Sequence, residues 1–266
     1  MWKWEAEGQP KAVVAIIHSA YEHHRRYAWL IEKLRSTGFH VVMGDLPGHG
    51  EDSAQKKVHD ENFDLYSMYV KQLIEVSMTH DLPVFVFGHG LGATLVMHAL
   101  QEKAIECAGV ILTSPWLQLK IQPSKLSTAL SSMGKLADNV KSVHEITIKQ
   151  LTRNYDVYIQ EKDDPYFHTT ITMKWYKELQ HLMKQIGSHT ETIQDIPMLM
   201  MTAERDKVTE VSHSQHWLVR QRLSEFQYKE WKNCYHDLFH ESEREDVFCY
   251  IESFMHNSLR SLGYIV

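Results

Sequence analysis

Short β-branched apolar runs alternate with amphipathic helical patterns along most of this chain, and this alternation restricts the fold more than any other feature. The first run is 12–17, and segment 27–34 after it carries apolar side chains at helical spacing. Further strands are expected at 40–46, 84–87 and 109–113, and further helices at 63–78 and 94–100. Strands joined by helices pair in parallel through right-handed crossovers. The sequence therefore predicts an α/β fold with a mostly parallel sheet flanked by helices.

The alternation stops within the second half of the chain and then resumes. Residues 116–195 are helix-rich and contain no convincing strand, whereas strands are expected again at 198–201 and 226–231 and a final helix at 245–258. A chain of 266 residues can form one α/β domain with an insertion. We predict a core formed by 1–115 and 196–266, with 116–195 inserted as a helical cap.

Charge and cysteine content exclude several classes of protein. The net charge is −6 and the basic residues are scattered, so no nucleic-acid partner is expected. The three cysteines are too few and too irregularly spaced for a disulfide framework, which indicates free thiols in a reducing compartment. The acidic N-terminal segment does not resemble a signal peptide, and no apolar run reaches bilayer length. We expect a cytoplasmic protein with no integral membrane segment, whose apolar cap surface could touch lipid transiently.

The turn after the expected strand 84–87 carries the first chemical motif. Gly88-His89-Gly90-Leu91-Gly92 stands between this strand and a helix, which is the setting of the nucleophile elbow G-x-S-x-G of acyl-transfer hydrolases. Gly90 occupies the position of the nucleophilic serine. A glycine-rich turn without special meaning is the alternative, because bare motif matches have a real false-positive rate.

An acid and a histidine follow in the chain order that this type of chemistry requires. Asp206 comes just after the expected strand 198–201, and His236 comes just after the strand that ends at Trp231. Parallel sheets hold ligands at the carboxyl ends of their strands. Asp206 and His236 are therefore the candidate acid and base, although each could be an ordinary surface residue.

These segments together resemble the α/β-hydrolase superfamily, in particular the monoacylglycerol lipase and bacterial lysophospholipase group of serine aminopeptidase S33-type hydrolases. The resemblance rests on His-Ser-Ala-Tyr-Glu-His at 18–23, on Gly-Asp-Leu-Pro-Gly-His-Gly at 44–50, and on cap segments 151–154 and 163–165. It implies an α/β-hydrolase fold, a monoacyl ester or lysolipid as the substrate, no cofactor, and an oxyanion hole made by the backbone N–H groups of Ala20 and Leu91. Ser19, Glu22 and His89 are assigned to substrate binding.

Three positions depart from the family pattern: Gly90 replaces serine, Ser19 replaces the glycine of His-Gly, and Ala93 replaces a second elbow glycine. Loss of a triad nucleophile costs on the order of 10⁶-fold in rate. We therefore expect an ester hydrolase scaffold that is inactive or nearly so, in which Gly90→Ser restores activity. The alternative is a natural pseudoenzyme that binds an acyl lipid or a protein partner. The sequence leaves open whether Gly90 is natural or introduced.

Other groups could replace the missing hydroxyl. Ser19 should lie near the elbow, but a side chain on the oxyanion loop is expected to attack from the wrong side, and a water activated by His236 would be slow. Two histidine pairs, His236 with His240 and His213 with His216, have ligand-like spacing but no evident third ligand, so no metal is predicted. Eight apolar or aromatic residues of the cap could line an acyl pocket or could simply pack in the core, and the sequence favours neither interpretation. They are Trp116, Leu117, Met133, Leu136, Tyr166, Met173, Trp175 and Tyr176.

Overall fold

The computed structural model describes residues 1–124 and 137–265 and contains a large central sheet. Seven strands lie in the order β1-β3-β2-β4-β5-β8-β9, and only β1 runs antiparallel to its neighbour. The strands are β1 (Trp2–Trp4), β2 (Ala12–Ile17), β3 (Phe39–Met43), β4 (Val84–His89), β5 (Gly109–Thr113), β8 (Met198–Ala203) and β9 (Phe226–Trp231). The predicted mostly parallel sheet is therefore confirmed.

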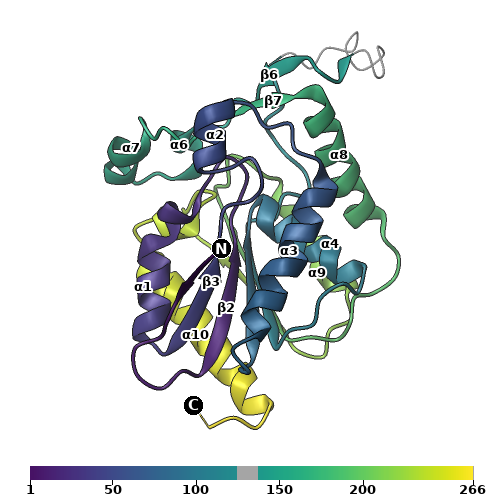
Figure 1. Cartoon of the computed structure of the whole chain (residues 1–266). Coiled ribbons are helices and arrows are strands. Elements are labelled where there is room, and N and C mark those ends of the chain that lie inside the picture. Colours follow the sequence, from purple (N-terminus) through teal and green to yellow (C-terminus); the bar gives the residue numbers. More distant parts are fainter. Residues whose placement is uncertain (125–136, 266) are drawn as a thin grey trace.

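Helices cover both faces of this sheet (Figure 1). On one face lie α1 (Ala28–Ser36) and α10 (Arg244–Ser261), and on the other lie α3 (Phe63–Met78), α4 (Leu91–Gln101) and α9 (Val211–Arg220). Strand β2 shows why both faces are covered, since all six of its residues are buried. Val13, Ala15 and Ile17 pack on the α3 and α4 side, while the alternate residues pack against α1 and α10. Such a continuous apolar run is typical of a parallel strand buried on both faces.

The cap segment extends over the carboxyl ends of the strands (Figure 1). Its described elements are β6 (Lys141–Val143), α6 (Ile148–Leu151), α7 (Tyr155–Glu161), β7 (Thr170–Thr172) and α8 (Met173–Ser188). Helix α8 turns its apolar side toward α3 and α4 and joins their hydrophobic core. The cap is therefore anchored to the same face of the sheet that carries the elbow helix α4.

The expectation that the cap contains no strand is wrong, because β6 and β7 pair antiparallel with each other. Each has only three residues, too short for a period of two to be recognised in sequence. The edge strand β1 was not anticipated for the same reason. Strand β4 extends to His89, two residues beyond the expected end, so the elbow begins within the strand.

Among the described residues, no helix is both long enough and apolar enough to cross a membrane. In Figure 1 the C-terminus is at the end of the sheet opposite to the cap, where α10 ends. The N-terminal strand β1 instead begins at the other end of the sheet, since Trp2 pairs with Met43 and stacks on His24.

Candidate active site

The turn at residue 90 has the backbone of a nucleophile elbow. Gly90 has φ +52° and ψ −117°, a conformation that side-chain-bearing residues adopt only with strain. The flanking glycines are required by close approach: a Cβ on Gly92 would overlap the carbonyl oxygen of Ile17, and one on Gly88 would lie 2.7 Å from Ala93 Cα. The turn thus keeps a sharp strand-to-helix geometry although its central residue has no side chain.

Asp206 and His236 meet at the carboxyl ends of β8 and β9, as expected. Their Oδ2 and Nδ1 atoms are 2.8 Å apart, and both residues are buried. Asp206 also accepts hydrogen bonds from the backbone N–H groups of Val208 and Thr209 and from the Thr209 hydroxyl. These bonds fix the carboxylate in the orientation that a base-orienting acid needs.

The charge states of the pair follow from burial and from their mutual contact. Burial alone would lower the pKa of His236, but the Asp206 carboxylate, together with Asp237 and Glu22, outweighs this effect and the pKa is raised. Burial would raise the pKa of Asp206, but His236 and the surrounding N–H donors lower it. Because the carboxylate can only accept, Nδ1 carries the imidazole proton and Nε2 presents a lone pair. That lone pair accepts from Trp116 Nε1, 3.1 Å away.

Ser19 occupies the space that an elbow side chain would fill. A Cβ built on Gly90 would overlap the Ser19 hydroxyl oxygen and lie 2.7 Å from Ser19 Cβ and 3.1 Å from Trp116 Nε1. The hydroxyl accepts a hydrogen bond of 3.1 Å from the backbone N–H of Leu91, one of the expected oxyanion donors. Serine at 19 and glycine at 90 are thus spatially complementary. A serine introduced at 90 alone collides with Ser19, which weakens the sequence-based expectation that Gly90→Ser suffices.

Buried polar groups hold the loop that carries Ser19 in place through hydrogen bonds. His18 donates from Nδ1 to the Ser19 carbonyl oxygen at 2.6 Å, and its Nε2 accepts from the backbone N–H of Leu46 at 2.8 Å. Glu22 accepts from the Ser19 N–H at 3.2 Å and from the Tyr27 hydroxyl at 2.8 Å. Position 19 therefore has little freedom to move away from the elbow.

Glu22 and His89 contact protein groups of the core in this structure, which supports a positioning role for both. His89 Nδ1 lies 2.9 Å from the Thr113 hydroxyl, and its ring centroid is 5.1 Å from that of His236. Glu22 approaches Arg26 Nε at 3.6 Å. The assignment of these two side chains to substrate binding stays a prediction from the sequence.

Arg26 is the centre of a buried charge network that the sequence did not indicate. Its guanidinium contacts Glu22, Glu161 of α7 and Asp237, the last at 3.0 Å. Asp237 also lies 2.7 Å from His240 Nδ1, and the pKa of His240 is raised to about 9 because Asp237 outweighs burial. The network joins the oxyanion loop, the cap and the loop of His236.

The histidine pairs weighed as metal ligands are engaged otherwise or lie elsewhere. Both ring nitrogens of His236 have protein partners, and His240 faces Asp237 and Glu161. His213 and His216 line a separate cavity of about 750 Å³ between α8 and α9. Glu22, His89 and Asp237 also cluster, with ligand-type atoms within 4.8 Å of one another. Arg26 pairs with both carboxylates, and His240, whose pKa is raised, pairs with Asp237, so these protein cations already accompany the charge of the cluster.

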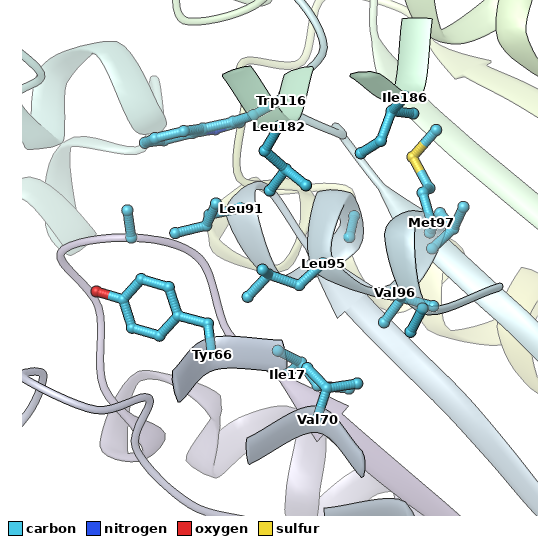
Figure 2. Close-up of a cluster of buried hydrophobic side chains, with 14 of the residues drawn as sticks. Ile17, Tyr66, Val70, Leu91, Leu95, Val96, Met97, Trp116, Leu182 and Ile186 are labelled. Carbon is cyan, nitrogen blue, oxygen red and sulfur yellow. The ribbon is translucent and has the colours of Figure 1, made fainter. Parts of the chain in front are cut away.

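Most described residues proposed to line an acyl pocket pack in the core beneath the cap. Figure 2 shows Trp116 with Leu91 and Leu95 of α4, Tyr66 of α3 and Leu182 of α8. Buried members of the same cluster are Trp116, Leu117, Met173, Trp175 and Tyr176. Half-buried Tyr166 instead contacts the guanidinium of Arg25, while Met133 and Leu136 lie outside the described residues. The burial of the cluster members favours the packing interpretation over an open acyl pocket in this structure.

The fold and the site are of the α/β-hydrolase type, with an Asp–His pair beside a nucleophile elbow. The profile of the serine aminopeptidase S33 family matches residues 8–243, and the chain belongs to this family of α/β-hydrolases, within its monoacylglycerol lipase and lysophospholipase group. It is 37% identical over 250 residues to the phospholipase YtpA of Bacillus subtilis, covering 93% of this chain and 96% of the relative. It is 25% identical over 261 residues to the monoglyceride lipase homolog of Monkeypox virus, covering 97% and 94%.

Solved structures show the same fold. The monoacylglycerol lipase of Paleococcus ferrophilus superposes with a TM-score of 0.82 at 23% identity, covering 97% of this chain and 98% of that one. A monoglyceride lipase variant from Saccharomyces cerevisiae, solved with a substrate analog, also gives 0.82, at 16% identity and 96% and 90% coverage. The predicted α/β-hydrolase fold is thereby confirmed.

Two roles were not recognised from the sequence. Trp116 was considered only as a cap residue, yet its indole N–H donates a hydrogen bond to Nε2 of His236. Ser19 was noted as a departure, but its position over Gly90 could not be derived from either motif alone. The available signal was that the two departures are reciprocal, with serine where the family has glycine and glycine where it has serine.

Proposed function

We propose that this protein is a carboxylic-ester hydrolase of the monoacylglycerol lipase and lysophospholipase type, in which no covalent step takes place at residue 90. The observation that carries the proposal is the buried 2.8 Å hydrogen bond between Asp206 and His236 beside the elbow. A buried carboxylate and imidazole cost free energy unless they are paired, and their pairing here leaves Nε2 as a proton acceptor. General-base catalysis accounts for that arrangement.

Gly90 determines what the site cannot do. It offers no hydroxyl, so an acyl-enzyme cannot form there. If a water held by His236 were the only nucleophile, hydrolysis would be slow, near the residual rates left when a triad nucleophile is deleted. The rate of the unaltered chain therefore depends on whether another hydroxyl serves the Asp206–His236 pair.

A single-chain acyl ester, such as a monoacylglycerol or a lysophospholipid, is the substrate class that we propose. Relatives of this chain are named as a phospholipase and as monoglyceride lipases. Trp116 contacts the base and belongs to an apolar and aromatic cluster that also contains Trp175 and Tyr176. Such side chains favour an acyl chain over a charged substituent.

The second candidate is a pseudoenzyme that binds an acyl lipid or a protein partner through the same site. It is favoured by one observation, namely that Trp116 already occupies the lone pair of His236. A binding protein could keep Asp206 and His236 as structure alone. The two candidates differ in whether removal of the imidazole affects turnover.

The experiment is hydrolysis of monoacylglycerol and lysophosphatidylcholine by the purified full chain, by His236→Ala and by Ser19→Gly/Gly90→Ser. The last variant rebuilds the family arrangement of the two loops without the collision at residue 90. We expect turnover by the rebuilt variant that is lost when His236→Ala is added. If neither the unaltered chain nor the folded rebuilt variant hydrolysed either ester, the hydrolase proposal would be refuted and the pseudoenzyme favoured.

A further inference from the structure

We propose that Ser19 is the nucleophile of this protein, so that the oxyanion loop and the elbow have exchanged roles. This inference rests on the proposed hydrolase function and adds a catalytic residue to it. From the sequence alone Ser19 was disfavoured, because a side chain on the oxyanion loop should approach the substrate carbonyl from the wrong side. The position of its hydroxyl removes that objection.

The Ser19 hydroxyl lies within the volume of the missing elbow side chain. A Cβ on Gly90 would overlap Ser19 Oγ, and the same Cβ would be 3.1 Å from the indole nitrogen that caps His236. Ser19 projects from a different loop than the usual nucleophile, but its oxygen ends in the same space. It is 2% exposed and is held there by His18 and Glu22 through its backbone.

The two expected oxyanion donors suit either arrangement of the loops. When the nucleophile is at residue 90, one donor is the N–H of the following residue, Leu91, and the other comes from Ala20 on the facing loop. With the nucleophile at residue 19, the following residue is Ala20 and the facing donor is Leu91. The two N–H groups thus keep the same sequence relation to the nucleophile in both cases, and the Leu91 N–H donates to Ser19 Oγ over 3.1 Å.

The helix that begins at Leu91 adds to this effect. Helix α4 has 11 residues, and its first N–H group, that of Leu91, donates to the Ser19 hydroxyl. The positive end of a helix favours negative charge that develops nearby. An alkoxide forming on Ser19, and the oxyanion that follows, would both benefit from that field.

The base requires one rearrangement. Trp116 Nε1 donates to His236 Nε2 in the closed site, so the indole must leave before Ser19 can transfer its proton. The acyl chain of a substrate enters from the cap side, where Trp116 lies (Figure 2), and it would displace the indole. Displacement frees the Nε2 lone pair, which the proposal requires to accept the Ser19 proton.

The reaction then proceeds in two steps, acylation of Ser19 and hydrolysis of the acyl-Ser19 ester. Ser19 Oγ bonds to the ester carbonyl carbon while its proton passes to His236 Nε2 and the carbonyl π pair moves to oxygen, held by Ala20 and Leu91 N–H. Collapse breaks the bond to the alcohol, which takes the proton from His236. A water then attacks the acyl-Ser19 ester with His236 as the base, releasing the fatty acid and restoring the hydroxyl.

The test is covalent labelling of the full chain with a long-chain fluorophosphonate, followed by tryptic mapping. Peptide 12–25 contains Ser19 as its only serine or threonine, so an adduct there is assigned directly. The variants are Ser19→Ala, Ser19→Cys and Ser19→Gly/Gly90→Ser. Ser77→Ala is the matched control, because Ser77 is a buried serine of α3 whose hydroxyl bonds only within its own helix. Thermal melts establish that each variant is folded.

We expect one adduct per chain, on Ser19, with unchanged labelling in Ser77→Ala and a rate at least about 10³-fold lower in Ser19→Ala. Ser19→Cys should instead take up the acyl group of a p-nitrophenyl ester as a thioester, which supports the proposal even if Ser19→Ala is unstable. Labelling of folded Ser19→Ala at the normal rate, or an adduct on another residue, would overturn it. Labelling of the rebuilt variant but not of the unaltered chain would also overturn it, while leaving the hydrolase proposal intact.

Discussion

A methyl group added at residue 90 should destabilise the protein, and removal of the Ser19 side chain should relieve much of that loss. A Cβ on Gly90 would overlap Ser19 Oγ and lie 2.7 Å from Ser19 Cβ. In Gly90→Ala the serine must therefore rotate or shift. It then loses the hydrogen bond from Leu91 N–H. The two positions are coupled through direct contact.

The size of the coupling follows from separating two costs. A side chain at φ +52° costs about 1–3 kcal/mol in backbone strain, whatever the residue at position 19. Overpacking against Ser19 costs a further amount of about 1–3 kcal/mol. Only this second cost disappears in Ser19→Gly/Gly90→Ala. In a double-mutant cycle, the double variant should therefore be more stable, by about 1–3 kcal/mol, than the sum of the two single effects predicts.

Urea unfolding followed by circular dichroism measures the cycle on the unaltered chain, the two single variants and the double variant. Equal m-values are needed for the free energies of unfolding to be compared. If the effects of Gly90→Ala and Ser19→Gly simply add to within about 0.5 kcal/mol, the two side-chain positions do not share one space. That result would refute the reasoning about the exchanged loops.

Three further predictions concern the groups around the base. Because the pKa of His236 is raised, the rate of ester hydrolysis should fall on acidification with a midpoint above pH 6.5. Asp206→Asn should lower kcat and move this acidic limb of the pH profile to lower pH, and a limb that stays in place would contradict the pairing of Asp206 with His236. Trp116→Phe removes a donor that stabilises neutral His236, so NMR titration should show a further rise in the pKa of His236. An unchanged or lower pKa would show that the indole does not act on Nε2. Arg26→Met leaves buried carboxylates unpaired and should cost about 3–5 kcal/mol in urea unfolding. The matched change at the partly exposed Arg35, Arg35→Met, should cost about 1 kcal/mol or less; equal losses would mean that the Arg26 network is not buried in solution.

Much of the fold could be predicted from sequence because its main elements carry strong periodic signals. Strand β2 is continuously apolar, and helices such as α3 present one buried face, so their types followed from spacing alone. Strands β1, β6 and β7 have three residues each and left no such signal. Their pairing depends on tertiary contacts that periodicity does not encode.

Motif order predicted the pairing of Asp206 with His236, since both follow strands that are neighbours in a parallel sheet. The relation of Ser19 to Gly90 was beyond such reasoning. It depends on how closely two loops approach, and a shift of about 1 Å decides whether a hydroxyl fills a site or misses it. The contact of Trp116 with His236 likewise depends on how the chain turns after β5, which no local pattern fixes.

The most direct test of the whole account is the mass of the protein during turnover of a long-chain p-nitrophenyl ester, stopped by acid within the first turnover. We predict one acyl group per unaltered chain, carried by peptide 12–25, and none in His236→Ala. Hydrolysis that proceeds with no acyl-enzyme, or an acyl group attached outside peptide 12–25, would contradict the claim that Ser19 and the Asp206–His236 pair act together.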